Sequence, residues 1–230
     1  MGPTDLSPAF VLHARKYGES HLLLDLLTLS AGRLPVMARG AGSPRSTRRA
    51  MLQPFIPLLV AWSGKGSIAN LRQAEPQGHY RLPEGPALFS GFYVNELILR
   101  LVEVHEPLPE LFAVYETCMQ RLASGSDIEA ALRQFELSLL QALGYGMDLA
   151  READNGAEIR PEASYVYETE QGIRLAGEHD RNLIQGDTLL ALAADLPLDD
   201  RQRREARRLM RRVIGYYLGD RPLRSRELFR

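Results

Sequence analysis

The chain of 230 residues is poor in the residue types that carry redox, metal or membrane chemistry. It has a single cysteine, Cys118, which excludes an intrachain disulfide and a cysteine-rich zinc site. It has no apolar run of about 18 residues, so we expect no transmembrane helix. Its first residues lack a basic segment followed by an apolar one, so we expect no secretory signal. Lysine is confined to Lys16 and Lys65, and arginine supplies the remaining positive charge. Arginine suits bidentate phosphate contacts, although heavy arginine use also follows from a GC-rich genome.

The motifs of familiar active sites are also missing. The sequence contains no HExxH, CxxC, GxSxG or P-loop pattern. Gly64-Lys65 is followed by Gly66 where a P-loop needs Ser or Thr. The five histidines are scattered, and none lies at metal-ligand spacing from another. We therefore predict no enzymatic activity, no catalytic residue, no metal site and no cofactor.

The net charge of −1 conceals a strong segregation of charge along the chain. Residues 1–80 carry nine basic and four acidic side chains, and residues 201–230 carry eleven and three. Residues 81–200 carry eight basic and 22 acidic side chains. Two basic ends around an acidic middle are typical of a surface for nucleic acid or for an acidic partner.

The most informative stretch runs from Gly32 to Phe55. It begins with alternating apolar and polar residues that predict a strand over 33–39. Glycines and a proline then break regular structure, and Arg45, Arg48 and Arg49 follow in a predicted loop without an acidic residue. Two interpretations stay open: the loop binds a polyanion, or it is a solvated loop whose arginines keep it soluble.

Residues 9–80 predict about five short strands joined by glycine-containing turns. These strands are expected at 9–15, 21–29, 33–39, 55–62 and 68–74. Five strands of this length are typical of a small closed barrel of the OB type, which often binds single strands through a basic groove with stacking aromatics. The candidate stacking residues are Phe10, Tyr17, Phe55, Trp62 and Tyr80, and we expect most of them to pack in the core instead.

From residue 87 the apolar pattern changes to a helical period. We expect helices at 87–104, 110–123 and from Ser126 to about residue 143, the last with a capping box between Ser126 and Glu129. Arg133 lies beside the apolar face of this third helix. It is either the ion-pair partner of a nearby glutamate or the group that receives the carboxylate of an incoming peptide.

The remaining sequence predicts a small hairpin, a short helix over 188–194 and a last helix over 199–218. The last helix has an apolar stripe for packing and an opposite face of arginines for solvent or a partner. Those arginines are Arg201, Arg204, Arg208 and Arg212. Its apolar face lacks the Trp and Phe that favour insertion into a lipid surface.

We therefore predict an α+β fold in which an N-terminal OB-fold β-barrel precedes a helical domain with a small β-hairpin insertion. The expected parts are a barrel over 1–80, a helical domain over 81–150, a small β region over 151–186, and a C-terminal helix and basic tail over 187–230 that packs with the helical domain.

Several stretches, in order along nearly the whole chain, resemble the RecO family of bacterial recombination mediators. They are AFVLHARKYGES (9–20), LLLDLLT (22–28), GRLPVMARGA (32–41), LQPFIPLLV (52–60), YVNELILRL (93–101), LRQFELSLLQALGYGMDL (132–149) and LGDRPLRSRELF (218–229). In members with a zinc finger, cysteines follow the segment that matches LGYGMDL. Residues 149–159 contain no cysteine. The resemblance thus implies a region 151–186 that lacks zinc and is held by packing alone.

The resemblance implies a non-catalytic bacterial protein of the cytoplasm and nucleoid. Such a protein binds single- and double-stranded DNA, anneals complementary strands, including those coated by the single-stranded-DNA-binding protein SSB, and acts with RecR to promote RecA loading. It also binds the acidic, apolar C-terminal tail of SSB. The alternative is a protein-interaction adaptor that binds acidic partners such as the SSB tail and has little direct contact with DNA. An RNA-binding OB protein is disfavoured by the resemblance alone.

The expected sites follow from these two activities. The DNA site comprises Arg33, Arg39, Arg45, Arg48, Arg49, Lys65 and Arg72, extended by Arg208, Arg212, Arg224 and Arg226. The SSB-tail site comprises Arg133 with the apolar residues Leu97, Leu101, Phe135 and Leu137. Many family members carry a second basic residue where this chain has Gln134, so tail binding here is expected to depend more on Arg133.

Overall fold

The computed structural model describes residues 5–43, 45–64, 66–78, 84–125, 127–220 and 222–229, with the backbone alone at 226, 228 and 229. The chain forms two compact units. The first unit comprises residues 1–126 together with 223–230, and the second comprises residues 127–222. This division falls between the second and third predicted helices, and the finer division into four parts stays a prediction.

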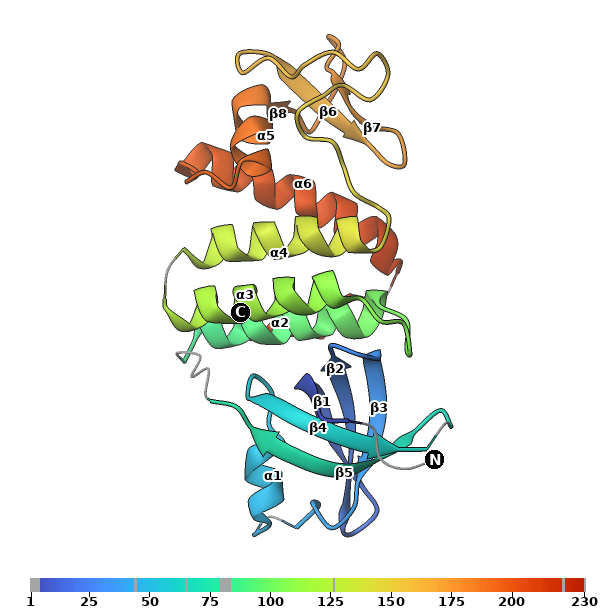
Figure 1. Ribbon diagram of the computed structural model, residues 1–230. Helices are drawn as coiled ribbons and strands as arrows, with labels where there is room; N and C mark the ends of the chain where they lie inside the picture. Colours follow the sequence, from blue (N-terminus) through green and yellow to red (C-terminus); the bar gives the residue numbers. More distant parts are fainter. Residues whose placement is uncertain are drawn as a thin grey trace. The chain divides into compact units, whose positions relative to one another are not determined.

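The first unit is built on a closed barrel of five strands (Figure 1). The strands are β1 (Ser7–Tyr17), β2 (His21–Thr28), β3 (Gly32–Ala38), β4 (Pro57–Ser63) and β5 (Ala69–Pro76). Around the barrel they follow the order β1-β2-β3-β5-β4, with β3 and β5 parallel and β4 antiparallel to β1. Every second residue of β3 is buried, as alternation of side chains across a strand requires. The predicted OB-type barrel is confirmed.

The segment predicted as an irregular basic loop contains a short helix, α1 (Thr47–Met51). The prediction of a loop throughout was therefore wrong. The five residues TRRAM contain no glycine or proline, so nothing in them opposes a helical turn. The following Leu52 is fully buried in the barrel core and fixes this turn to the barrel.

Two helices lie against one end of the barrel, α2 (Pro86–Leu101) and α3 (Pro109–Ala123) (Figure 1). Each begins with a proline, which costs no hydrogen bond at the first helical position. The buried Asn95 of α2 joins the helices to the barrel. Its amide nitrogen donates to the Leu12 carbonyl at 2.9 Å, and its oxygen accepts from the Tyr115 hydroxyl at 2.8 Å. The Phe10 ring packs beside Tyr115, with 4.9 Å between ring centroids.

The C-terminal segment returns to the first unit as a 3-10 helix, η1 (Arg224–Phe229), which the sequence did not predict. The backbone amides of Arg224 and Ser225 donate to the two carboxylate oxygens of Glu96 at 2.9 and 2.8 Å. Burial alone raises the pKa of Glu96, but these hydrogen bonds and the nearby Arg100 outweigh it and hold that pKa below its ordinary value.

The second unit combines three helices with a three-stranded sheet. The helices are α4 (Ile128–Ala142), α5 (Gly186–Ala193) and α6 (Asp200–Leu218), and the sheet has the order β7 (Gly172–Leu175), β6 (Ser164–Glu168), β8 (Ile184–Gln185). The predicted hairpin is confirmed by the pairing of β6 with β7. The sequence missed β8, because two residues are too short to show a period.

Both long helices of the second unit begin at an aspartate. The Asp127 side chain accepts from the Ala130 amide at 3.0 Å, so Asp127 is the N-cap of α4. The prediction of Ser126 as the cap was wrong, and Ser126 itself lies outside the described residues. Asp199 caps α6 in a capping box with Gln202.

The region 151–186 is held by hydrogen bonds and ion pairs as well as by packing, so the expectation of packing alone was wrong. The Ala153 amide donates to the Ile173 carbonyl at 2.7 Å, and the Arg160 amide donates to the Tyr165 hydroxyl at 2.9 Å. Arg174 pairs with Asp180 at 2.8 Å and with Glu168. Hydrogen bonds from Arg174 lower the pKa of Asp180 to about 2.

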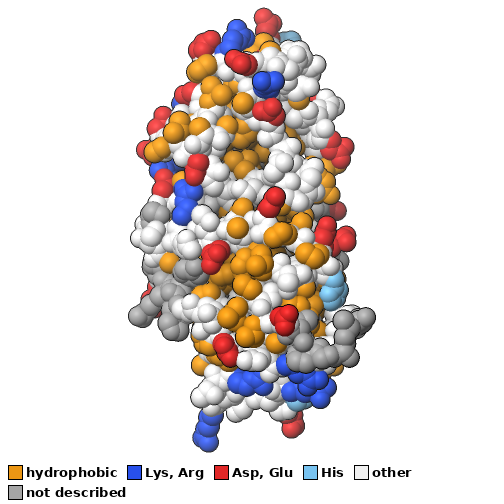
Figure 2. All heavy atoms as spheres, in the orientation of Figure 1, with side chains coloured by type: hydrophobic (Ala, Val, Ile, Leu, Met, Phe, Trp, Pro, Cys, Tyr) orange, Lys and Arg blue, Asp and Glu red, His pale blue; other side chains and the backbone are white. Residues whose placement is uncertain are grey.

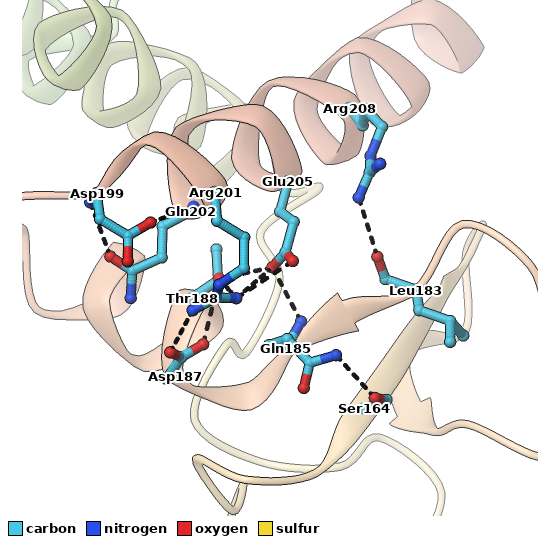
Figure 3. Close-up of polar contacts among 10 residues, drawn as sticks. All are labelled: Ser164, Leu183, Gln185, Asp187, Thr188, Asp199, Arg201, Gln202, Glu205 and Arg208. Carbon is cyan, nitrogen blue, oxygen red and sulfur yellow. Dashed lines mark hydrogen bonds and ion pairs between the residues drawn. The ribbon is translucent and has the colours of Figure 1, made fainter.

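A buried polar network attaches α5 and β8 to α6 (Figure 3). The Glu205 carboxylate accepts from the Thr188 hydroxyl at 2.7 Å and from the Gln185 amide at 3.1 Å. Arg201 joins the same carboxylate at 3.2 Å and also pairs with Asp187 at 2.5 Å. Arg201 was predicted to face solvent or a partner, but it is a structural residue of this network.

Candidate nucleic-acid interface

The basic loop, residues 39–49, is tied to the turn between β1 and β2. The Gly42 amide donates to the Ser20 carbonyl at 2.9 Å. A Cβ atom on Gly42 would lie 2.7 Å from the backbone of Ser20, so this close approach requires glycine. Nearby, the Gly40 amide donates to the His21 ring at 3.3 Å. The loop is thus fixed at both glycines, and its arginines are held at one end of the barrel.

The four predicted arginines of the basic loop differ in exposure. Arg39 and Arg45 are exposed, and Arg48 and Arg49 are half-buried. Arg48 donates to the Arg39 carbonyl at 3.3 Å, and Arg49 donates to the Gly42 carbonyl at 3.5 Å. Each of these bonds uses one of five guanidinium donors, so both groups keep donors for a phosphate while they stabilise the loop.

The end of β1 adds cations that the sequence reasoning missed. Arg15 and Lys16 are exposed on β1, and the adjacent Tyr17 has 51% of its surface exposed. Tyr17 pairs with His21, the residue that Gly40 contacts, so this strand end lies beside the basic loop. The available signal was the run of polar residues at 15–20, which breaks the alternation of the strand. In Figure 2, Lys and Arg side chains gather at the barrel end that carries α1.

Arg72 of β5 belongs to the same end of the barrel. Met37 of β3 pairs in parallel with Asn70 of β5, and Arg39 and Arg72 each lie two residues further along. Arg39 follows the end of β3, Arg72 lies where the pairing of β5 with β4 shifts register, and both side chains are exposed. Arg72 is exposed, and its Nε donates to the Ser63 hydroxyl at 2.6 Å.

The five candidate stacking aromatics mostly occupy the core, as expected. Phe10, Phe55 and Trp62 are 1%, 6% and 8% exposed. Tyr17 is the exposed one among those described, and Tyr80 lies outside the described residues. Tyr17 is therefore the barrel aromatic that is placed to meet a base.

Arg33, which the sequence predicted to bind DNA, makes contacts within the first unit. Its guanidinium donates to the Val102 carbonyl at 3.0 Å and pairs with Asp25 at 3.4 Å, and 21% of its side chain is exposed. It therefore links β3 to the segment after α2. We leave Arg33 out of the proposed interface because these two contacts hold its guanidinium against Asp25 and the segment after α2.

Comparison with known proteins identifies the family of this chain. The family model for the recombination protein O N-terminal region matches residues 4–80, and the model for the recombination protein O C-terminal region matches residues 83–227. The chain belongs to the RecO family. A DNA repair protein RecO from Methylococcus capsulatus is 51% identical over 98% of this chain and 93% of its own length. RecO proteins from Actinobacillus succinogenes and Haemophilus influenzae are 45% and 44% identical over 96% and 98% of this chain, and over 93% and 96% of their own lengths.

Membership of the RecO family makes this chain a DNA repair and recombination protein. Within the described ranges, no group of three or more His, Cys, Asp or Glu side chains is arranged to hold a metal ion. None of the helices in the described part combines the length and the apolar character needed to cross a bilayer.

The residues expected to bind the SSB tail divide between the two units. Leu97 and Leu101 belong to the first unit, with Leu97 buried and Leu101 half-buried. Phe135 and Leu137 belong to the second unit, with Phe135 buried and Leu137 half-buried. The tail site of this RecO family member stays a prediction.

Arg133 forms an ion pair with a nearby glutamate, which was one of the two interpretations of this residue from the sequence. Its guanidinium pairs with Glu136 at 2.8 Å, and the two side chains are 12% and 1% exposed, so the ion-pair interpretation is confirmed. Its neighbour Gln134 donates to the Leu192 carbonyl at 2.9 Å. A peptide carboxylate at Arg133 would share the guanidinium with Glu136.

The C-terminal arginines of the expected DNA site lie in both units. Arg208 and Arg212 are exposed on α6 of the second unit. Arg224 is exposed in the first unit, where its amide is bound by Glu96. The side chain of Arg226 and the whole of Lys65 lie outside the described residues.

Proposed function

We propose that this RecO family member is a non-enzymatic recombination mediator that binds single- and double-stranded DNA and anneals complementary strands. The observation that supports this proposal most strongly is the basic end of the barrel. Its exposed cations are Arg15, Lys16, Arg39, Arg45 and Arg72, joined by the half-buried Arg48 and Arg49. In the described part of the chain, no ion pair neutralises Arg15, Lys16, Arg39 or Arg45.

Such a surface suits annealing because it binds phosphates and leaves the bases free. Contacts to phosphates carry no sequence information, so any pair of complementary strands is accepted. Neutralising the phosphates also reduces the repulsion between two strands that approach each other. Tyr17 adds one exposed ring on which an unpaired base can stack before it finds its complement.

The partners that we propose come from the resemblance to the family. With RecR, the protein would promote the loading of RecA onto DNA coated by SSB, and it would bind the acidic, apolar tail of SSB. Arg133 is the proposed cation for the tail carboxylate, with Leu97, Leu101, Phe135 and Leu137 as the proposed apolar contacts. The C-terminal residues Arg208, Arg212, Arg224 and Arg226, and Lys65 in the barrel, are proposed to extend the DNA surface.

A titration with labelled DNA at a low and a high salt concentration tests direct DNA binding. A mediator that contacts phosphates through arginines loses affinity steeply with salt, with a logarithmic slope of about 0.7 per phosphate on single strands and about 0.9 on duplex. An adaptor that binds only acidic proteins shows little DNA binding at either salt concentration. An RNA strand of the same length and sequence provides the comparison for the sugar, and a clear preference for RNA would contradict the proposal.

A further inference from the structure

The exposed face of α6 carries a regular row that ends in an aromatic residue. Arg208, Arg212 and Tyr216 are four residues apart and are all exposed. Because an α-helix rises about 1.5 Å per residue, successive members of the row are about 6 Å apart along the axis. This step places the side chains at regular intervals for an extended chain that lies along the helix.

Three arginines near the N-terminus of α6 are neutralised by ion pairs, whereas Arg204 and the arginines further along the helix keep their charge. Arg201, Arg203 and Arg207 form ion pairs with Asp187, Asp127 and Glu129, respectively. Among the described residues, Arg208, Arg211 and Arg212 have no ion pair; Arg208 donates only to the Leu183 carbonyl, at 3.4 Å (Figure 3).

These three arginines line a groove of about 300 Å³ within the second unit. Leu183 and Leu209 form part of its apolar wall. The Glu205 carboxylate also lines the groove, but it is paired with Arg201, so the groove offers three guanidinium groups without an ion pair beside an apolar surface.

Tyr216 is held in place beside the arginines but stays open to solvent. Its hydroxyl donates to Glu170 at 2.9 Å, and its ring meets the Tyr217 ring edge-on at a centroid distance of 5.2 Å. Tyr217 is itself stacked on Tyr145 at 4.2 Å. Half of Tyr216 remains exposed, at 51%. The carboxylate of Glu170 repels a phosphate at this end of the row, so a nucleic acid strand would present a base here.

We propose that α6 is a second single-strand site, in which phosphates lie on Arg208, Arg211 and Arg212 and an unpaired base stacks on Tyr216. This inference rests on the proposed function and adds to it the residue that selects single strands. A base in a duplex is already stacked and paired, so Tyr216 contributes to single-strand binding alone. With the barrel site, each chain would then have two sites for single strands, one on each unit.

The test uses the full-length chain with Arg45, Arg48 and Arg49 changed to Ala, so that the barrel contributes less to binding. In this background, Tyr216→Ala removes the ring, and Tyr216→Phe removes only the hydroxyl, which donates a hydrogen bond to Glu170. The probes are a labelled mixed-sequence single strand and a hairpin duplex with the same number of phosphates. Thermal unfolding of each variant confirms that the fold is retained, as expected for an exposed side chain.

We expect Tyr216→Ala to weaken single-strand binding about fivefold or more, since stacking of one base contributes at least about 1 kcal/mol. Tyr216→Phe should bind like the background, and neither change should alter duplex affinity or the salt slope. An equal loss on both probes, an equal loss in the Phe variant, or no loss in the Ala variant would overturn the inference. If the wild-type chain binds neither probe at low salt, the proposed function itself fails, and the site on α6 fails with it.

Discussion

The proposed DNA-binding role of the basic loop makes a quantitative prediction about salt. Changing Arg45, Arg48 and Arg49 together to Ala removes up to three phosphate contacts. Each contact to a single strand contributes about 0.7 to the logarithmic salt slope, so the slope should fall by about 2. The assay is fluorescence anisotropy of a labelled single strand over a series of salt concentrations, with the wild-type and variant chains measured side by side.

The structure shows why a second variant is needed. Arg48 and Arg49 also hold the loop, through the carbonyl groups of Arg39 and Gly42, so the Ala variant loses both charge and loop order. Changing the same three residues to Lys keeps the charge but loses the planar fork. The Lys variant should therefore keep most of the salt slope, even if its absolute affinity is lower.

A control with the same change of net charge separates a local site from a general field. Arg151, Arg160 and Arg181 are exposed in the acidic region of the second unit, and changing all three to Ala removes the same charge far from the basic loop in sequence. This control should keep the wild-type slope. An equal fall in the control and in the loop variant, or an unchanged slope in the loop variant, would refute the assignment of DNA binding to this loop.

Three further predictions concern single contacts. Arg133→Ala leaves the buried Glu136 without the Arg133 cation and should cost about 3–5 kcal/mol of stability in urea unfolding. The tail site is therefore better tested with Arg133→Gln combined with Glu136→Gln. This double variant should lose affinity for an SSB-tail peptide and keep its affinity for DNA, and unchanged peptide affinity would rule out Arg133 as the tail cation. The folded-state pKa of Glu96 is lowered, so its contribution to stability is present above its unfolded pKa and is lost as pH falls through the folded value. Hydrogen exchange at the Ser225 amide should therefore accelerate, relative to the intrinsic rate, as pH falls below the ordinary glutamate pKa of 4.5. Glu96→Gln should remove this pH dependence. Asn95→Leu removes the partner of two buried polar groups, the Leu12 carbonyl and the Tyr115 hydroxyl, and should lower the free energy of unfolding in urea by about 2–5 kcal/mol. A loss below about 1 kcal/mol would contradict the role of Asn95 in joining α2 to the barrel.

The barrel was predictable from sequence because its signals are local. Alternation places Leu34, Val36 and Ala38 inside, and the turns carry glycine where the chain reverses, as at Gly32 with φ of 63°. The short helix α1 and the strand β8 were not predictable, because five and two residues are too few to show a helical or strand period. Both depend on neighbours from elsewhere in the chain.

The candidate site was less predictable than the fold because charge in a sequence does not reveal its partners. Arg33 and Arg201 look like free surface arginines in sequence, yet Asp25 and the distant Asp187 pair with them. Conversely, Arg15 and Lys16 lie at the end of the predicted strand over 9–15 and just after it, and only the barrel places the end of β1 beside the basic loop. A residue's role in binding therefore depends on which carboxylates the fold brings near it.

The central claim, that this RecO family member anneals DNA, is tested most directly by strand annealing without nucleotide. Two complementary oligonucleotides with donor and acceptor fluorophores are each coated with SSB and then mixed with and without the protein. Fast, ATP-independent energy transfer that appears only with the protein is the predicted result. No acceleration, with the protein shown to be folded and bound to SSB, would contradict the claim and favour an adaptor without annealing activity.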